Sequence, residues 1–335
     1  MSEIRYCPLR GERVIIAQNR LHRPSDFNVC KESGDDISEC PFERGKEEFT
    51  PKEIFSIKNE KGEWLTRVVP NLYHALSVEE RKISYREGFF EYQDGLGAHE
   101  VIIETPDHFK KMKDYSIEEF KNYLLAVQSR YIDLQNDKRL EYISIFKNSG
   151  VNAGATLKHP HSQIIATPFI PKEIDREIEI ARNYYKDHKR ALLDDIVNEE
   201  LRLEKRVVCK NDHFIAFLPY ASFFPFEIFI TSLNGVCSIK ALNYDRIISL
   251  SEILKEVFIK LYKVLGDFDF NMIFKNSPPI TKQTDPNYFY EIDSFYRFYI
   301  QITPRLYKFA GFEIATNMHI NPLSPEEASF KLKNI

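Results

Sequence analysis

Two histidines and a glutamine stand at alternate positions in LKHPHSQIIATP, residues 157–168. In a β-strand, residues i and i+2 point to the same face, so His159, His161 and Gln163 are expected to share one face. One ring nitrogen of a neutral imidazole can attack phosphorus if the other nitrogen stays protonated and donates a hydrogen bond to a backbone carbonyl. The residues alone leave three interpretations open: metal ligation, nucleophilic catalysis, and a polar loop without chemistry.

The glutamine favours group transfer over hydrolysis. Attack of His161 on the α-phosphorus of a nucleoside diphosphate derivative would give a nucleotidyl-histidine, and Gln163 can donate an amide N–H to a phosphate oxygen. A sugar phosphate is a stable anionic leaving group that hardly needs a general acid, whereas a third histidine would suit leaving groups of higher pKa. In the preceding NAGATL, Gly154 lets the backbone approach a phosphate, and further donors stand on Asn148, Ser149 and Thr156.

The composition is that of a globular chain, and its charge balance excludes partners that would be bound through net charge alone. Of 335 residues, 43% are hydrophobic and 29% are charged, with a formal net charge of −4. This balance gives no general affinity for nucleic acid or acidic membranes. No apolar run approaches the roughly 20 residues that cross a bilayer. Since the five cysteines are widely spaced and odd in number, they do not resemble a disulfide framework. We therefore expect a cytoplasmic protein without nucleic-acid or membrane partners.

Strands and two long helices must position the motif. Strands are predicted where β-branched and aromatic residues run up to turn formers, and helices where apolar residues recur at helical spacing. Ser116 and Glu119 form a predicted capping box for the first helix. The charged segment 172–206 has helical spacing and is interpreted as a connector. The clearest predicted strands are 98–106, 142–150, 162–168, 226–233, 270–279 and 296–304, and the predicted helices are 116–137 and 243–267.

The order of these elements recurs in the second half, which predicts an internal repeat. ISIFKNS (143–149) matches NMIFKNS (271–277), EVIIET (100–105) matches EIFITS (227–232), and HSQIIATP (161–168) matches YIQITP (299–304) at the Gln-Ile pair. Gln163 then corresponds to Gln301 and His161 to Tyr299, so the second half lacks the histidine pair. The repeat predicts an α+β fold of two tandem halves, each a mostly antiparallel half-barrel or open sheet packed with a helix, and a single active site.

Several motifs resemble one known family. HPHSQ resembles the His-Pro-His-x-Gln active-site motif of the galactose-1-phosphate uridylyltransferase family, within the histidine triad superfamily. RPSDF, CPFERG, VVPNLYHAL, HEVIIETPDH, FKNSG, YIQITP and GFEIA stand in the family's order over nearly the whole chain. RPSDF, NLYHALS and the C-terminal strand region look closer to the ADP-glucose phosphorylase branch. The resemblance implies two histidine-triad-like halves, 1–171 and 207–335, joined by the helical connector 172–206.

The resemblance also implies roles for individual residues. It implies ping-pong transfer through a nucleotidyl group on His161, no organic cofactor, and a homodimer with the active site assembled across its interface. The α-phosphate would be held by Gln163, Thr156 and Asn148. Asn71 and Tyr73 would lie at the nucleoside, Arg20 and Arg23 at the phosphates or sugar phosphate, where a guanidinium is well suited, and Gln301 and Glu313 at the hexose or acceptor phosphate.

A structural zinc site is a further implication of the resemblance. Family members hold zinc with Cys-x-x-Cys, a histidine after an SPDH-like turn, and the first histidine of His-Pro-His. Carried over, the ligands are Cys40, His108 and His159, with Glu43 in place of the second cysteine. Carboxylate oxygen is an acceptable zinc ligand, although the replacement of one thiolate predicts weaker binding. The alternative is that Glu43 pairs with a basic residue and no metal binds.

Other residues with ligand chemistry are given no metal role. Some family members carry a second metal site built from histidines near the C-terminal strand. Tyr299 and Gln301 stand in that region here, so no second metal site is expected. His74, His99 and His319 are assigned structural or surface roles.

The predicted function is a nucleotidyltransferase that acts on nucleotide sugars. UDP-glucose:galactose-1-phosphate uridylyl transfer is the leading activity, with a nucleotide sugar and a sugar 1-phosphate or phosphate as substrates. Because nothing in NLYHAL selects the base, an ADP-sugar phosphorylase that moves AMP to phosphate is the first alternative. A non-catalytic nucleotide-binding protein is the second alternative. The hydrolysis of diadenosine polyphosphates is disfavoured by Gln163.

Overall fold

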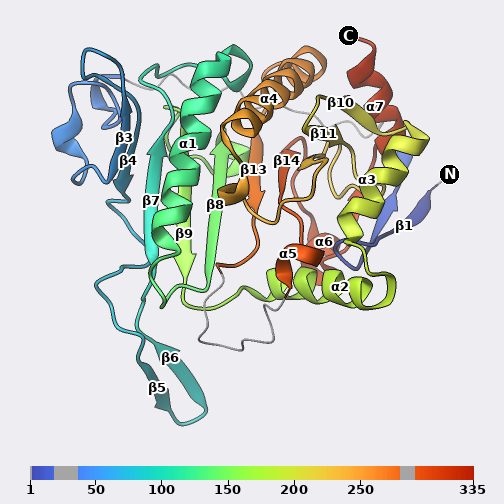
Figure 1. Cartoon of the computed structure of the whole chain (residues 1–335), viewed down its shortest axis with the longest axis horizontal. Helices are drawn as coiled ribbons and strands as arrows, with labels where there is room; N and C mark the ends of the chain where they lie inside the picture. The colour runs from blue at the N-terminus through green and yellow to red at the C-terminus, as the bar shows by residue number, and fades with distance from the viewer. Residues whose placement is uncertain (1, 19–36, 280–290) are drawn as a thin grey trace.

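A ten-stranded antiparallel sheet forms the centre of the molecule (Figure 1). The computed structural model describes residues 2–18, 37–279 and 291–335. The strands of the two halves meet edge to edge, because β8 of the first half pairs with β13 of the second. The predicted α+β class with a mostly antiparallel sheet is confirmed. In spatial order the strands are β10 (Val207–Lys210), β11 (Phe214–Phe217), β12 (Ile228–Ser232), β14 (Tyr299–Pro304), β13 (Phe270–Lys275), β8 (Tyr142–Ser149), β9 (His161–Thr167), β7 (Ala98–Ile103), β4 (Trp64–Pro70) and β3 (Phe55–Lys58).

Two long helices cover one face of this sheet (Figure 1). α1 (Ile117–Leu134) contacts first-half strands, α4 (Tyr244–Leu265) contacts second-half strands, and the helices contact each other. The predicted capping box begins α1: the Ser116 hydroxyl accepts from the Glu119 N–H at 3.1 Å, and the Glu119 carboxylate accepts from the Ser116 N–H at 2.8 Å. Satisfying these N–H groups starts the helix where its apolar stripe can enter the core. That stripe is fully buried at Phe120, Leu124, Val127 and Tyr131.

On the opposite face, the second-half strands are covered by an N-terminal hairpin and the connector. Residues of both pack against Phe217, Phe229 and Tyr299 in a second apolar cluster. Tyr299 stands where the first half has His161, so core packing fills that position in the second half. The covering elements are β1 (Glu3–Cys7), β2 (Glu12–Ile16), α2 (Lys172–His188), α3 (Leu192–Leu203) and β15 (His319–Asn321), which pairs with β2 in parallel.

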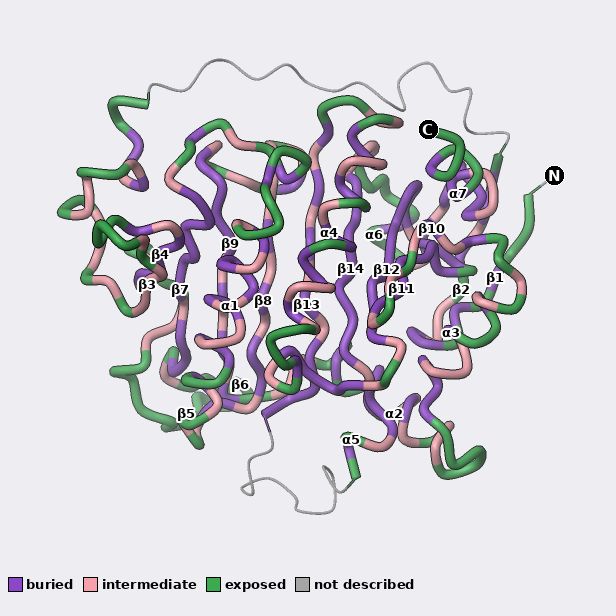
Figure 2. The backbone as a smooth tube through the Cα atoms, turned by 45° about the horizontal axis from the view of Figure 1, so that its top comes forward, coloured by how far each residue is buried: buried purple, intermediate pink, exposed green. Residues whose placement is uncertain are grey.

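The remaining elements are a hairpin, short helices and 3-10 turns. The hairpin of β5 (Ser84–Glu87) and β6 (Phe90–Gln93) projects from the first half and is exposed along its length, whereas the central strands are buried (Figure 2). Among the described residues, no helix has the length and apolar character needed to span a membrane. The short helices are α5 (Ile292–Phe295), α6 (Gly311–Thr316) and α7 (Pro325–Lys333), with 3-10 turns at Ile37–Glu39, Glu47–Phe49, Met112–Asp114, Val151–Ala153 and Ile239–Ala241.

The internal repeat is confirmed for the strands that carry the two glutamines. Gln163 lies opposite Phe146, and Gln301 lies opposite Ile273. Ile273 in turn lies opposite Phe146 across the junction of the halves, so one row of residues joins the glutamines. At a strand spacing of about 4.8 Å, the two glutamine backbones are roughly 14 Å apart.

The predicted alignment of the two IFKNS segments is wrong by one position. It makes Lys147 equivalent to Lys275, but Lys147 reaches Glu104 on the helix-covered face. Lys275 reaches Glu177 of α2 on the opposite face. Side chains alternate between faces along a strand, so a one-residue offset reverses every one of them. The identical letters therefore occupy different environments.

The alignment of EVIIET with EIFITS fails for the same reason. Glu100 forms a buried ion pair with Arg130 of α1 at 2.7 Å. Glu227 pairs with Arg10 from the N-terminal segment at 2.9 Å, on the other face. The strand register assigns His99, and not Glu100, as the counterpart of Glu227.

Candidate active site

His161 stands at the first position of β9, and its ring is held by its own motif. Nδ1 donates to the backbone carbonyl of His159 at 2.8 Å, which leaves the Nε2 lone pair free. The residue is 6% exposed, and burial lowers the pKa of the ring despite that hydrogen bond. The imidazole is therefore neutral near pH 7, which is the form that can attack phosphorus.

A phenylalanine that the sequence analysis missed braces both histidines. The Phe42 ring centroid lies 5.5 Å from that of His161 and 6.0 Å from that of His159, with edge-on geometry in both pairs. Phe42 lies between two candidate metal ligands, Cys40 and Glu43, in CPFE. The same short segment therefore supplies ligand atoms and an apolar wall.

Gln163 points to the same face as His161 and contacts a histidine that was assigned no site role. Its Oε1 atom lies 2.8 Å from Nε2 of His99 in β7. Asn71, after β4, is also present, because its Nδ2 atom lies 3.1 Å from the same Nε2. His99 thus belongs to the site, joining the predicted phosphate ligand to the predicted nucleoside segment.

Asn148 is oriented by a residue of the second half. Asn271 in β13 donates from Nδ2 to Asn148 Oδ1 at 2.8 Å and to the Ala153 carbonyl at 2.9 Å. This leaves the amide nitrogen of Asn148 as the group available to an anion. Asn271 was missed because its only signal in the sequence is its place in NMIFKNS, where the alignment was offset.

The end of β8 and the loop after it carry the other predicted donors. Ser149 is half-buried and Thr156 is exposed. Gly150, between them, has φ of +84°, and a Cβ added there would lie 1.8 Å from Asp269 Oδ1. Because Asp269 accepts from the Asn152 N–H at 2.8 Å and from its amide at 2.7 Å, the glycine is needed for this anchoring.

A buried ion pair lies beneath the histidine motif. Lys147 Nζ donates to the Glu104 carboxylate at 2.9 Å and to the His161 carbonyl at 3.3 Å. Glu104 also accepts from Ser162 Oγ at 2.5 Å and from the Tyr115 hydroxyl at 2.8 Å. This network fixes the backbone of β9 from the helix-covered side.

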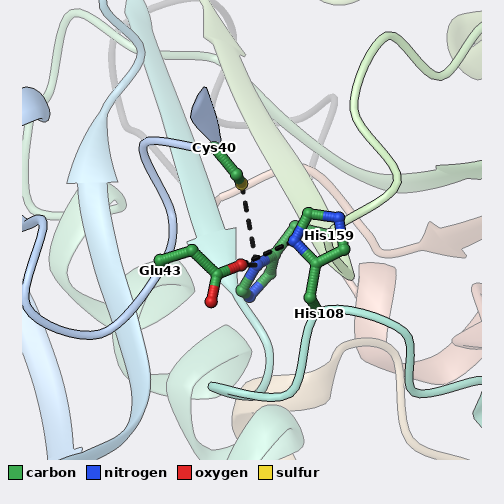
Figure 3. Close-up of side chains that lie close together, drawn as sticks. All are labelled: Cys40, Glu43, His108 and His159. Atoms are coloured by element: carbon green, nitrogen blue, oxygen red, sulfur yellow. Dashed lines mark hydrogen bonds and ion pairs between the residues drawn. The ribbon is translucent and has the colours of Figure 1, made fainter. Parts of the chain in front are cut away.

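The four candidate metal ligands converge, and their side chains point toward one another (Figure 3). Their ligand atoms all lie within 4.8 Å of one another. Glu43 Oε1 lies 2.6 Å from His108 Nδ1 and 3.1 Å from His159 Nδ1. Cys40 Sγ lies 3.8 Å from His159 Nδ1.

The protonation pattern of this cluster fits a metal ion. His159 Nε2 donates to the Thr105 carbonyl at 2.8 Å, so Nδ1 of the neutral ring turns a lone pair toward Glu43. Burial lowers the pKa of His159. Burial alone would raise the pKa of Glu43, but the hydrogen bond from His108 lowers it. A carboxylate facing an imidazole lone pair calls for a cation between them, and two nitrogens, one sulfur and one oxygen make an acceptable zinc set.

Of the other predicted substrate residues, the structure describes Tyr73, Gln301 and Glu313. Arg20 and Arg23 lie outside the described residues. Tyr73 is 87% exposed on the turn after β4. Gln301 donates to buried Glu227 at 2.7 Å. Glu313 caps α6 by accepting from the Ala310 N–H at 3.0 Å.

Both halves of the chain match one protein family. The N-terminal domain of galactose-1-phosphate uridyl transferase matches residues 1–171, and its C-terminal domain matches residues 177–335. ADP-glucose phosphorylase from Arabidopsis thaliana is 28% identical over 338 residues, which cover 99% of this chain and 93% of that protein. Galactose-1-phosphate uridylyltransferase from Thermotoga maritima is 28% identical over 341 residues, covering 99% and 98%.

The fold agrees with these matches. The crystal structure of the Arabidopsis thaliana ADP-glucose phosphorylase with bound ADP-glucose has a TM-score of 0.84 at 27% identity, and the match covers 100% of this chain and 99% of that chain. The family expected from the motifs is confirmed. The chain is a member of the galactose-1-phosphate uridyl transferase family of nucleotidyltransferases.

Proposed function

We propose that this protein transfers a uridylyl group between hexose 1-phosphates through His161. The observation that carries the proposal is the 2.8 Å hydrogen bond from His161 Nδ1 to the His159 carbonyl. It fixes the tautomer of a buried, neutral imidazole and leaves Nε2 as a nucleophile. The relatives named galactose-1-phosphate uridylyltransferase support the choice of substrates.

The reaction has two displacements. His161 Nε2 attacks the α-phosphorus of UDP-glucose, the bond from that phosphorus to the bridging oxygen breaks, and glucose 1-phosphate leaves with the electron pair. A phosphate oxygen of galactose 1-phosphate then attacks the same phosphorus and the N–P bond breaks, which gives UDP-galactose and restores the imidazole. The amides of Gln163 and Asn148 would donate to the α-phosphate oxygens while charge builds on them.

Intact-mass spectrometry tests the covalent step directly. The wild type incubated with UDP-glucose should gain one UMP, and His161→Ala should gain none. Tight binding of the nucleotide sugar without an adduct would instead favour a non-catalytic nucleotide-binding protein and would overturn the proposal.

Phosphorolysis of an ADP-sugar is the second candidate activity. The 28% identical ADP-glucose phosphorylase favours it. The same experiment with ADP-glucose separates the two candidates, since the faster adduct identifies the base. Release of the nucleotide by phosphate or by galactose 1-phosphate then identifies the acceptor.

We also propose that the cluster of Cys40, Glu43, His108 and His159 holds zinc. The ion would supply a positive centre that neutralises Glu43 and fixes the His159 side chain. His159 would in turn hold the carbonyl that orients His161. Metal analysis of the purified protein should find about one zinc per chain, and a metal-free, fully active protein would contradict this.

A homodimer with shared sites completes the proposal. Gln301 lies roughly 14 Å from Gln163 along the sheet, so a role for the second half at the sugar is easier to fulfil from a second copy. Phe89 and Phe90 at the tip of the β5–β6 hairpin are 101% and 76% exposed, which suits a protein contact. Mixing His161→Ala subunits with Glu313→Gln subunits should restore activity if the sites are shared, and should not if each chain works alone.

A further inference from the structure

A relay of two hydrogen bonds runs from the backbone to Gln163. The Ala75 N–H donates to His99 Nδ1 at 3.1 Å. His99 Nε2 then lies 2.8 Å from Gln163 Oε1. Each member of the relay restricts what the next one can do.

The first hydrogen bond fixes the tautomer of His99. A backbone N–H can only donate, so Nδ1 must offer a lone pair, and the neutral ring carries its proton on Nε2. The amide nitrogen of Asn71, 3.1 Å from Nε2, is itself a donor, because Asn71 Oδ1 already accepts from the Tyr73 N–H at 2.9 Å. The Nε2–H of His99 therefore goes to Gln163.

The second hydrogen bond fixes the orientation of the Gln163 amide. Its oxygen must face His99, because the reverse orientation would leave the Nε2–H of His99 without an acceptor among the described residues. The amide NH2 group is turned away from His99, and among the described residues it has no hydrogen-bond partner. The glutamine therefore presents donors to the open face of β9, which suits phosphate oxygens.

The second half has a residue equivalent to His99, and toward its glutamine that residue is a hydrogen-bond acceptor where His99 is a donor. Gln163 lies opposite Val101 and Gln301 opposite Phe229. The residues two positions before Val101 and Phe229 are therefore structural counterparts.

Those counterparts are His99 and Glu227. Glu227 accepts from Gln301 Nε2 at 2.7 Å, so the second-half glutamine has its amide group turned the other way. Glu227 is 0% exposed and is paired with Arg10 at 2.9 Å. One residue on the neighbouring strand thus decides whether the glutamine offers its NH2 group or its oxygen to the remaining space.

We infer that His99 is a positioning residue for transfer: it holds Gln163 with the amide N–H groups toward the α-phosphate. The inference rests on the proposed function, and it names the group that sets the polarity of that site. It predicts that donor capacity at position 99, and not the imidazole itself, is what the reaction requires.

Two near-isosteric variants separate these properties. His99→Gln keeps an N–H near the place of Nε2, whereas His99→Met removes the donor and adds no charge. The rate constant for adduct formation at saturating nucleotide sugar should fall about 10- to 100-fold in His99→Met, short of the loss from removing an oxyanion donor itself. His99→Gln should stay within about threefold of the wild type, and the KM should change little in either variant.

A third variant reproduces the second-half arrangement. His99→Glu offers only acceptors and should be as slow as His99→Met or slower. Circular dichroism and melting temperature establish that each variant is folded, and if His99→Met is not, the comparison of His99→Gln with His99→Glu decides. Equal rates for the donor and non-donor variants would overturn the inference.

A double-mutant cycle shows whether His99 acts through Gln163. In a Gln163→Ala background, His99→Met should cause no further loss, because the amide that it orients is gone. Additive losses would mean that His99 acts by another route and would overturn the inference. Failure of the proposed function gives a distinct result, since the wild type itself would then form no adduct with UDP-glucose or ADP-glucose.

Discussion

The backbone carbonyl of His159 lies 2.8 Å from Nδ1 of His161 and accepts a hydrogen bond from it. The side chain of His159 meanwhile enters the cluster with Cys40, Glu43 and His108. Fixing that side chain therefore also fixes the carbonyl that selects the tautomer of His161. A metal ion bound by this cluster would thereby influence the nucleophile through His159.

The cluster predicts a gain of affinity from one substitution. Glu43→Cys supplies a second thiolate, a softer ligand than carboxylate, and should tighten zinc binding on the order of tenfold. Competition with a chromophoric chelator measures this. Glu48→Cys, at an exposed position of the same segment, adds a thiol outside the cluster and should leave the affinity unchanged. Equal affinities for Glu43→Cys and the wild type would show that these four residues are not the site.

Asn271 should affect transfer although it belongs to the second half. Asn271→Asp keeps the shape but sets a carboxylate oxygen against Asn148 Oδ1, where the amide now donates at 2.8 Å. We expect the adduct-forming rate to fall about tenfold, the effect of one misdirected hydrogen bond. Stopped reactions analysed by intact mass give the rate. Asn136→Asp, at an exposed position, makes the same chemical change away from the site and should retain the wild-type rate.

Removing one member of the Glu104–Lys147 pair should destabilise the fold more than replacing both members. Lys147 is 4% exposed and Glu104 is 1% exposed, so Lys147→Met leaves an uncompensated buried carboxylate. The free energy of unfolding should fall by about 3–5 kcal/mol. In Glu104→Gln/Lys147→Met a neutral amide replaces the carboxylate, so at least half of the lost free energy of unfolding should be recovered. Urea unfolding measures both variants, and a double variant less stable than Lys147→Met would contradict the prediction.

His319 should make the folded state sensitive to acid. Burial lowers its pKa from 6.5 to about 4, in the presence of Glu227, Arg10, Glu313 and Arg305. Between those pH values the unfolded chain binds a proton that the folded chain does not. The free energy of unfolding is therefore undiminished above about pH 6.5 and falls as the pH drops toward 4. The contribution is at most about 3 kcal/mol.

A neutral replacement tests this pH dependence. The free energy of unfolding of His319→Gln should fall less between pH 7 and pH 4.5 than that of the wild type, because glutamine does not titrate in this range. Chemical unfolding at both pH values gives the comparison. Parallel losses in the two proteins would assign the acid sensitivity to other groups.

The sequence by itself determined the family, the α+β class and the residues of the motif. His159, His161 and Gln163 could be placed on one face because alternation along a strand is a local property of the backbone. The capping box at Ser116 was likewise local, since its partners are three residues apart. Cys40, Glu43, His108 and His159 were brought together by the family resemblance, because no local rule links residues so far apart.

Tertiary structure decided everything that depended on register. The two IFKNS segments looked equivalent, yet a one-residue offset sends Lys147 and Lys275 to opposite faces. The offset cannot be read from the sequences of the two segments, because it is set by how whole strands pack and not by any residue within them. For the same reason the sequence predicts only a structural or surface role for His99, and the pairing of β7 with β9 is what brings its ring to the amide of Gln163.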